Sequence, residues 1–311
     1  MSRNKIGLVL SGGGAKGAFE IGVWRALENL HVTELIDGII GSSVGAMNAA
    51  LLDTVGLERA ADVWANLKQS DLLHLNPDKS FQVKDTQIAP MNKADYPRLS
   101  SADPEEQRVL QFYRYYSMLQ NDVPKDALLQ LATNAVHSGF PISQEKINDL
   151  IVKNIRFASQ KRKLYAVCTE SKSPWNPKVF DLSEYSLDER RRIILASSAI
   201  PVVYEGTDGV RIQGRGYFDG GISANTPVLQ MHELGWTRTI TVWLHHKVKP
   251  VQLPEGHENI DIIPPHTLGG HFGTIWVNRS KKAIDQIRGA YDTMQLKEQI
   301  LSLAERVRQE Q

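Results

Sequence analysis

Two serines stand side by side in the segment Gly41-Ser42-Ser43-Val44-Gly45, between the apolar run IDGII and the alanine-rich AMNAALLD. In the pattern GxSxG the central serine, here Ser43, occupies a sharp strand-to-helix turn, and the flanking glycines let the turn form without side-chain clashes. Such a turn lifts the hydroxyl out of the sheet, so Ser43 is the candidate nucleophile and Ser42 points elsewhere. The pattern alone is loose, because a serine between glycines also makes an ordinary turn.

A second glycine-rich loop, GGGAKG at 12–17, follows the apolar run at 6–10. Adjacent parallel strands end at the same edge of a sheet, which would place the backbone amides of Gly12, Gly13 and Gly14 near the Ser43 hydroxyl. Consecutive glycines expose N–H groups without side-chain obstruction, as an oxyanion hole requires, and one such donor lowers the barrier by roughly 3 to 4 kcal/mol. Both loops together therefore favour a serine hydrolase over a simple turn.

A serine hydroxyl is a poor nucleophile until a base takes its proton. The chain has nine histidines, and none lies in a context that marks it as that base. Those considered are His232 in a predicted helix, His245 and His246 after a predicted strand, and His271 after two glycines. Asp219 is the better candidate, because it ends an apolar strand and Gly220 and Gly221 follow it directly. The amides after these glycines are candidate donors that would keep the Asp219 carboxylate ionised.

The glycine loop at 12–17 also allows a different function. Gly12, Gly14 and Gly17 fit the GxGxxG pattern of dinucleotide-binding folds, between a strand and a helix as that pattern requires. That function needs an acidic residue at the far end of the second strand, whereas Asp37 stands at its start. A phosphate-binding P-loop fails because no GK[ST] closes the loop. A dinucleotide-binding module, or a lipase effector regulated by a nucleotide, stays as the alternative.

The chain resembles the patatin-like phospholipases. The segments that carry the resemblance are SGGGAKGAF at 11–19, GSSVGAMNA at 41–49, ASSAIPVVY at 196–204, DGG at 219–221 and NTP at 225–227. That family joins a glycine-rich oxyanion loop, a GxSxG turn and a DGG or DGA motif, and it uses a Ser–Asp dyad. The matching segments span residues 5 to about 245 and leave the segment at 70–125 and the tail beyond 250 uncovered.

The resemblance implies that Ser43 is the nucleophile and Asp219 the base, with Gly12, Gly13 and Gly14 as oxyanion donors. The implied substrate is a phospholipid or lysophospholipid, cleaved at a carboxylic ester, and neither a metal nor an organic cofactor is implied. Lys16 occupies the family's Arg or Lys position near the oxyanion loop or the lipid phosphate; the alternative is a solvated charge. An ordinary α/β-hydrolase is disfavoured, because only one strand precedes the strand that leads to Ser43.

The elements that must position these residues follow from hydrophobic periodicity. The pattern predicts a strand at 6–10, a helix at 17–30, a strand at 36–40 and a helix from 46. A helical crossover of this kind makes the two strands parallel in one sheet. Together with the resemblance, this predicts a three-layer α/β/α patatin-like fold with a mostly parallel central sheet.

Further along, the proline-rich segment 70–125 reads as an insertion, and its aromatic residues at 112–116 suggest a lid over an acyl groove. We expect helices at 124–137 and 143–155, and strands at 164–170, 202–205, around 217–218, at 240–244 and at 260–263. The capping box SLDE at 186–189 predicts the start of another helix. The tail at 280–311 predicts one amphipathic helix packed on the body through Ile284, Ile287, Tyr291, Met294, Leu301 and Ala304. One domain spans 1–311.

Composition narrows the functional class. Thirty-six basic against 35 acidic residues give a net charge of +1, so no nucleic-acid partner is expected. The single cysteine, Cys168, cannot form an intramolecular disulfide, which favours a reducing, cytoplasmic location. The apolar part of the N-terminal segment is shorter than a signal peptide needs, and no run reaches the length of a membrane span. Contact with lipid is therefore expected to be peripheral.

Overall fold

The computed structural model describes residues 5–68, 71–72, 144–172, 175–200, 209–248, 251–268 and 279–310. Three predictions lie outside these residues: nearly all of the insertion at 70–125 with its lid, the helix at 124–137 and the strand at 202–205. Among the described residues, no helix combines the length and the apolar character needed to cross a membrane.

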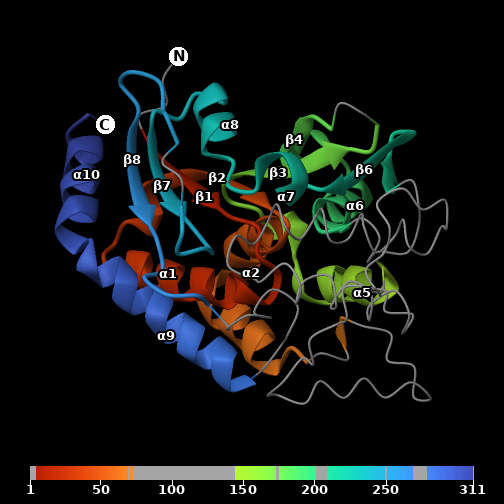
Figure 1. The fold of residues 1–311 in the computed structure, drawn as a ribbon, viewed down its shortest axis with the longest axis horizontal. Coiled ribbons are helices and arrows are strands. Elements are labelled where there is room, and N and C mark those ends of the chain that lie inside the picture. The colour runs from red at the N-terminus through yellow and green to blue at the C-terminus, as the bar shows by residue number, and fades with distance from the viewer. Residues whose placement is uncertain are drawn as a thin grey trace, which may run out of the picture.

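The first four elements confirm the predicted order. They are β1 (Ile6–Leu10), α1 (Ala18–Asn29), β2 (Ile36–Ser42) and α2 (Val44–Asn66). β1 and β2 are parallel, with Leu8 beside Ile39 and Leu10 beside Gly41. The loops after these two strands therefore emerge at the same edge of the sheet, next to the start of α2 (Figure 1).

The central sheet has eight strands and is mixed. The remaining strands are β3 (Lys163–Glu170), β4 (Pro177–Asp181), β5 (Val210–Ile212), β6 (Arg215–Asp219), β7 (Arg238–Val242) and β8 (Glu258–Ile262). Their order is β5-β6-β3-β2-β1-β7-β8, and β4 also pairs with β3. The run β3-β2-β1-β7-β8 is parallel, whereas β4 and β6 are antiparallel to β3, and β5 is antiparallel to β6. The mostly parallel sheet is thus confirmed.

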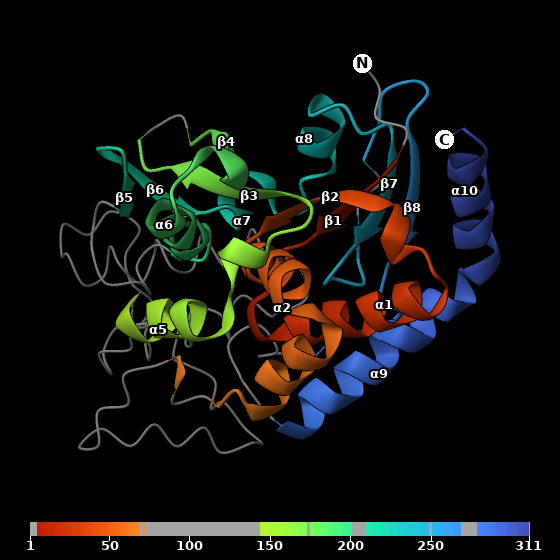
Figure 2. The ribbon, with the colours of Figure 1, turned by 180° about the vertical axis from the view of Figure 1, so that it is seen from behind.

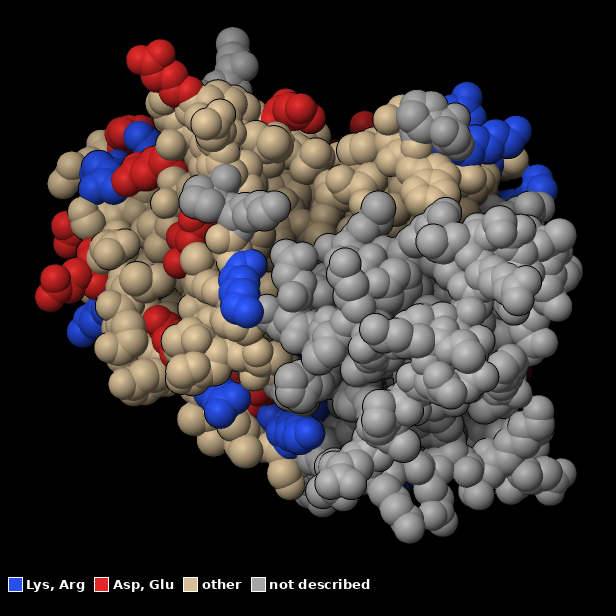
Figure 3. Space-filling model, in the orientation of Figure 1, with Lys and Arg blue, Asp and Glu red and all other residues tan. Residues whose placement is uncertain are grey.

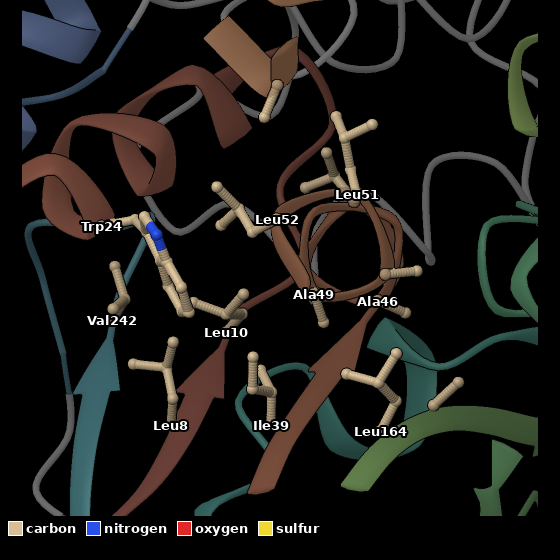
Figure 4. Packing of buried hydrophobic residues seen from close by; sticks show 14 of the residues in the cluster. Leu8, Leu10, Trp24, Ile39, Ala46, Ala49, Leu51, Leu52, Leu164 and Val242 are labelled. Carbon is tan, nitrogen blue, oxygen red and sulfur yellow. The ribbon is translucent and has the colours of Figure 1, made fainter. Parts of the chain in front are cut away.

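Helices cover both faces of the sheet, which gives the three predicted layers. Alternate residues of a strand point to opposite faces, so Leu8 and Leu10 join the core under α1 and α2, while Val9 packs with the residues of α8 (Val228–Glu233). Figures 1 and 2 show α1 and α2 on one side of the sheet and α8 on the other. In Figure 4, Ala49 of α2 points toward strand residues such as Ile39, while Leu52 points toward Trp24 of α1.

Two further helices flank the later strands. α5 (Gln144–Asn154) matches the helix expected at 143–155, and α6 (Leu187–Ser197) begins at the predicted capping box. There the Ser186 hydroxyl accepts from the Glu189 amide, while the Glu189 carboxylate accepts from Ser186. Short helical turns complete the described part: η1 (Gly14–Gly17), η2 (Thr33–Leu35), η5 (Phe157–Ser159), η6 (Leu182–Glu184) and α7 (Gly221–Ala224).

The C-terminal tail corrects the prediction of one amphipathic helix. Two helices form, α9 (Arg279–Gln295) and α10 (Lys297–Gln309). α10 buries its apolar side, but α9 packs on α1 through small residues: a Cβ added at Gly289 would lie 2.1 Å from the Phe19 carbonyl oxygen. Backbones this close exclude large side chains from the contact. The apolar residues expected to pack inward, Ile284, Ile287, Tyr291 and Met294, are exposed instead.

Candidate active site

Ser43 lies on the turn between β2 and α2, as the GxSxG pattern predicted. Its φ of 54° and ψ of −124° are unusual for a residue with a side chain. Both flanking positions require glycine, because a side chain there would clash with the backbone. A Cβ at Gly41 would lie 2.3 Å from the Gly45 carbonyl carbon, and one at Gly45 would lie 2.4 Å from the Leu10 oxygen. Ser42 is fully buried, and among the described residues its hydroxyl has no hydrogen-bond partner. Of the two serines, Ser43 is the one with the strained backbone.

The structure brings Ser43 and Asp219 together across 176 positions of sequence. The Ser43 hydroxyl donates to Asp219 Oδ2 at 2.7 Å, and the Gly221 amide donates to Asp219 Oδ1 at 2.7 Å. The prediction that a glycine amide supports this carboxylate is therefore confirmed. Ser43 is 8% and Asp219 1% exposed, so their hydrogen bond is shielded from water.

Strand pairing explains why these two residues meet. β2 and β4 pair with some of the same residues of β3, so they must lie on opposite edges of β3. β6 and β4 also share residues of β3 as partners, so β6 lies on the edge opposite β4. β2 and β6 therefore lie on the same edge of β3. The two strands run toward each other along that edge. β2 ends with Ser42 beside Val167, and β6 ends with Asp219 beside Cys168. The chain ends of β2 and β6 thus deliver the hydroxyl and the carboxylate to neighbouring positions.

Ser197, at the end of α6, forms hydrogen bonds with the backbone at the end of β2 and at the end of β6. Its hydroxyl accepts from the Ser43 amide at 3.0 Å and donates to the Val167 oxygen at 2.6 Å. Its carbonyl accepts from the Gly220 amide at 3.1 Å, and the Thr169 hydroxyl donates to the Asp219 carbonyl at 2.8 Å. Sequence reasoning missed the role of Ser197. The only signal was its place in the segment ASSAIPVVY, which resembles a family block.

The glycine loop lies beside Ser43, with one correction to its predicted donors. A Cβ at Gly12 would lie 3.2 Å from Ser43 Cβ, which places the loop against the hydroxyl-bearing side chain. The Gly12 amide, however, donates to the Asn225 oxygen at 2.9 Å, so it is already occupied. Among the described residues, the amides of Gly13 and Gly14 have no acceptor. The geometry therefore favours Gly13 and Gly14 as oxyanion donors, and not Gly12.

The NTP segment anchors this loop. The Asn225 side chain donates to the Gly12 oxygen at 3.2 Å, and the hydroxyls of Thr226 and Ser11 share a hydrogen bond of 2.7 Å. Ser11 also donates to the Val242 oxygen in β7 at 2.7 Å. The family resemblance singled out the NTP segment but implied no structural role for it. The structure shows that it fixes the backbone of the glycine loop.

Lys16 is buried, with 3% of its surface exposed, so the alternative of a solvated charge is wrong. It lies in η1, and its charge acts on Asp285 of α9. Burial raises the pKa of Asp285 to about 6, and the cations Arg288, Lys16 and Lys281 oppose that rise. This electrostatic interaction of Lys16 with a carboxylate of α9 is a structural role that the sequence did not suggest.

A second buried carboxylate lies behind the site and was also missed. Glu20 accepts from Asn48 Nδ2 at 2.7 Å, and Asn48 Oδ1 accepts from the Trp64 indole at 2.8 Å. Burial raises the pKa of Glu20 well above its ordinary value, and the hydrogen bond from Asn48 opposes the rise. Asn48 and Trp64 also line the cavity beside Ser43. This network fixes two walls of that cavity.

The acid of the dinucleotide alternative does not lie where it would be needed. Asp37 stands near the start of β2 and accepts from the Trp236 indole at 2.7 Å, whereas the glycine loop lies at the other end of the sheet. Two of the histidines considered as bases have other partners: His232 bonds to His257 at 2.8 Å, and His246 bonds to Thr267 at 3.1 Å. His271 lies outside the described residues. In the described part of the chain, no three His, Cys, Asp or Glu residues are grouped to hold a metal ion.

An apolar cavity of about 150 Å³ opens beside the dyad. Its walls come from the glycine loop, from both halves of α2 and from α5. Its lining residues are Gly14, Ala15, Ser43, Val44, Met47, Asn48, Leu51, Val63, Trp64, Leu67, Leu72, Ile147, Leu150, Ile151, Asn154, Ile155, Ser198 and Ile200. Only four of these 18 residues are polar, so the cavity suits a hydrocarbon chain. α2 spans it because Gly56, with φ of 79°, bends the helix between its two lining stretches.

A family model described as patatin-like phospholipase matches residues 8–232. A patatin-like phospholipase domain-containing protein of Caenorhabditis elegans, ZK370.4, is 43% identical over 68 residues, which cover 21% of this chain and 5% of that protein. The matched segment is thus a small part of that relative.

One solved structure, VipD, supports the likeness of fold. VipD from Legionella pneumophila superposes with a TM-score of 0.50 at 13% identity, over 96% of this chain and 67% of that chain. ExoU, a type III effector protein of Pseudomonas aeruginosa, gives a TM-score of 0.40 at 16% identity, over 96% of this chain and 54% of that one. At these identities the likeness to VipD is one of fold.

Proposed function

The chain belongs to the patatin-like phospholipase family, and on that premise we propose that it is a phospholipase A or lysophospholipase that cleaves carboxylic esters through a Ser43–Asp219 dyad. The observation that carries the proposal is the 2.7 Å hydrogen bond from the Ser43 hydroxyl to the Asp219 carboxylate. A nucleophile and a base within hydrogen-bond reach, with the base held by a third group, is the arrangement that nucleophilic catalysis requires.

In the first half-reaction, Ser43 Oγ attacks the acyl carbonyl carbon while its proton passes to Asp219 Oδ2. The electron pair of the carbonyl double bond moves to the carbonyl oxygen, which the amides of Gly13 and Gly14 stabilise as an oxyanion. When the tetrahedral intermediate collapses, the bond to the alcohol breaks. The departing alkoxide takes the proton from Asp219, and an acyl ester of Ser43 remains.

In the second half-reaction, water attacks the acyl carbon and gives a proton to Asp219. Collapse of the second intermediate breaks the bond to Ser43 Oγ, which takes the proton back from Asp219. A fatty acid leaves and the dyad is restored. The Gly221 amide keeps the Asp219 carboxylate oriented through both steps, because it bonds to Oδ1 and leaves Oδ2 for the proton.

The cavity between α2 and α5 receives the acyl chain in this proposal. A dry cavity of this size holds an apolar molecule of roughly six carbons, so it accommodates the part of the chain next to the ester. The substrate is therefore a lipid with at least one acyl chain, met at a membrane surface. We also propose that the protein is one domain and acts in the cytoplasm, since its lone Cys168 is a buried free thiol.

Two variants test the dyad. Ser43→Ala and Asp219→Asn should each stay folded and lose hydrolysis of p-nitrophenyl butyrate and of lysophosphatidylcholine. Labelling with a fluorophosphonate should occur in the wild type, disappear in Ser43→Ala and fall strongly in Asp219→Asn. Turnover like that of the wild type in either folded variant would refute the dyad. Titration with NAD(P) tests the dinucleotide alternative directly, since binding without any hydrolysis would favour it.

A further inference from the structure

The outward face of α9 is apolar. Ile284, Ile287, Tyr291 and Met294 are 47%, 70%, 64% and 40% exposed. Their spacing of three, four and three residues places them on one stripe of the helix. They are four of the nine large hydrophobic residues that are exposed in the described part of the chain. Contiguous apolar surface of this kind marks an interaction site.

The inward face of α9 shows why this stripe cannot turn into the core. It consists of small and polar residues: Lys282, Asp285, Gly289 and Thr293 are buried there. α1 approaches so closely that a Cβ at Gly22 would lie 1.9 Å from the Gln286 oxygen. Rotation of the helix would force branched side chains into that contact. The outward position of the stripe is therefore fixed by backbone packing.

Basic side chains border the stripe. Lys281 and Arg288 are exposed and lie on the flank of the helix next to Ile284, and Arg288 also pairs at 3.7 Å with the buried carboxylate of Asp285. In Figure 3, basic side chains lie over the part of the molecule that α9 occupies. An apolar stripe edged by cations suits an anionic lipid surface, because the stems of Lys and Arg lie along acyl chains while their charges reach headgroups.

The first turns of α9 adjoin the proposed acyl cavity. Lys282 Nζ donates to the carbonyl oxygens of Leu67 and Ala65 at the end of α2, and Leu67 lines the cavity. Asp285, one turn later, lies within electrostatic reach of Lys16 in η1, at the end of the glycine loop. Figures 1 and 2 both show α9 along the end of the molecule where α2 ends. A surface bound by α9 would thus meet the protein beside the cavity.

We propose that the exposed stripe of α9 docks the protein on a bilayer that contains anionic lipids, so that a lipid substrate passes from the bilayer into the adjacent cavity. This inference rests on the proposed function for its substrate. Docking itself does not depend on catalysis. A second copy of the chain is the other occupant to consider, but four side chains expose on the order of 400 Å², about half of what each partner contributes to a stable interface.

The test compares three variants with the wild type by vesicle co-sedimentation. Ile287→Glu with Tyr291→Glu places two anions on the stripe, and Leu187→Glu with Ile263→Glu makes the same charge change at exposed apolar residues of α6 and of the segment after β8. Lys281→Gln with Arg288→Gln removes the bordering charges. Vesicles of phosphatidylcholine alone and of phosphatidylcholine with phosphatidylglycerol are used, and hydrolysis of soluble p-nitrophenyl butyrate and of vesicle lipid is measured in parallel.

We expect the stripe variant to lose at least about tenfold in vesicle binding and in hydrolysis of vesicle lipid, while soluble-ester hydrolysis is unchanged. The matched variant should bind as the wild type does, and the charge variant should lose the preference for phosphatidylglycerol. Equal binding by the stripe variant would overturn the proposal. So would a dimer of the wild type, seen by light scattering, that the stripe variant abolishes. Vesicle binding that depends on the stripe, with no hydrolysis of any ester, would refute the proposed function and support docking.

Discussion

The hydroxyl of Ser197 offers the sharpest test of how the dyad is positioned. It bonds to the Ser43 amide and to the Val167 oxygen, and all three residues are buried. Ser197→Ala leaves a buried donor and a buried acceptor without their partner, each at about 1 to 3 kcal/mol. We expect the free energy of unfolding to fall by roughly 2 to 4 kcal/mol, measured by urea denaturation.

The same change should lower kcat, because the Ser43 backbone is held at φ of 54° by this contact. Misplacement of a reacting group by about 1 Å can cost roughly 100-fold in rate, so we expect kcat on p-nitrophenyl butyrate to fall roughly 10- to 100-fold. That fall equals about 1.4 to 2.7 kcal/mol in the barrier. KM should change little, since Ser197 does not line the cavity.

Ser186→Ala is the matched control at the other end of the same helix. It removes the capping hydroxyl of α6 and should cost about 1 kcal/mol of stability, with kcat unchanged. A folded Ser197→Ala enzyme that keeps the kcat of Ser186→Ala would refute the reasoning. Ser197 would then stabilise the fold without positioning the nucleophile.

Three further predictions concern the rest of the molecule. Gly289→Ala places a Cβ 2.1 Å from the Phe19 oxygen and should lower the free energy of unfolding by roughly 1 to 3 kcal/mol; a urea midpoint like that of the wild type would contradict the close contact. Burial and the neighbouring His232 lower the pKa of His257 to about 4, so the folded state binds this proton only at a lower pH than the unfolded state does. Stability should therefore decline as the pH falls from about 6.5 to about 4, by about 1 to 2 kcal/mol for this partly exposed ring, and His257→Gln should show a smaller decline in urea titrations. Burial and the nearby Asp219 carboxylate raise the pKa of Cys168, so Ellman's reagent should label it only after unfolding, and rapid labelling of the native protein would show that the thiol is accessible.

The local elements of the site were predictable from sequence. Glycines that must approach other backbone atoms, as Gly41 and Gly45 do, leave a clear pattern, and so did the capping box at Ser186. The pairing of Ser43 with Asp219 was expected from a family resemblance and not from periodicity. No local pattern encodes that β2 and β6 run toward each other along one edge of β3.

The sequence-based predictions were wrong or incomplete where contacts between distant segments determine the environment of a residue. The occupied Gly12 amide depends on Asn225, more than 200 positions away, and the buried Lys16 depends on α9. The apolar stripe of α9 was predicted to face the core because its spacing is that of a packed helix. α9 instead turns its small residues toward α1, because Gly22 and Gly289 let the two helix backbones come into close contact. Neither segment of sequence shows this contact by itself.

Pairing with β3 sets the distance between Ser43 and Asp219. The number of residues between them in the chain does not set that distance. The connection from α2 to α5 falls between Ser43 and Asp219 in sequence, whereas β2 and β6 are each placed by their pairing with β3. Changes in the cavity residues of α2 and α5 can therefore alter how a lipid is bound while pairing with β3 keeps the reacting atoms in position. Substrate preference and chemistry can accordingly diversify independently in proteins built on this sheet.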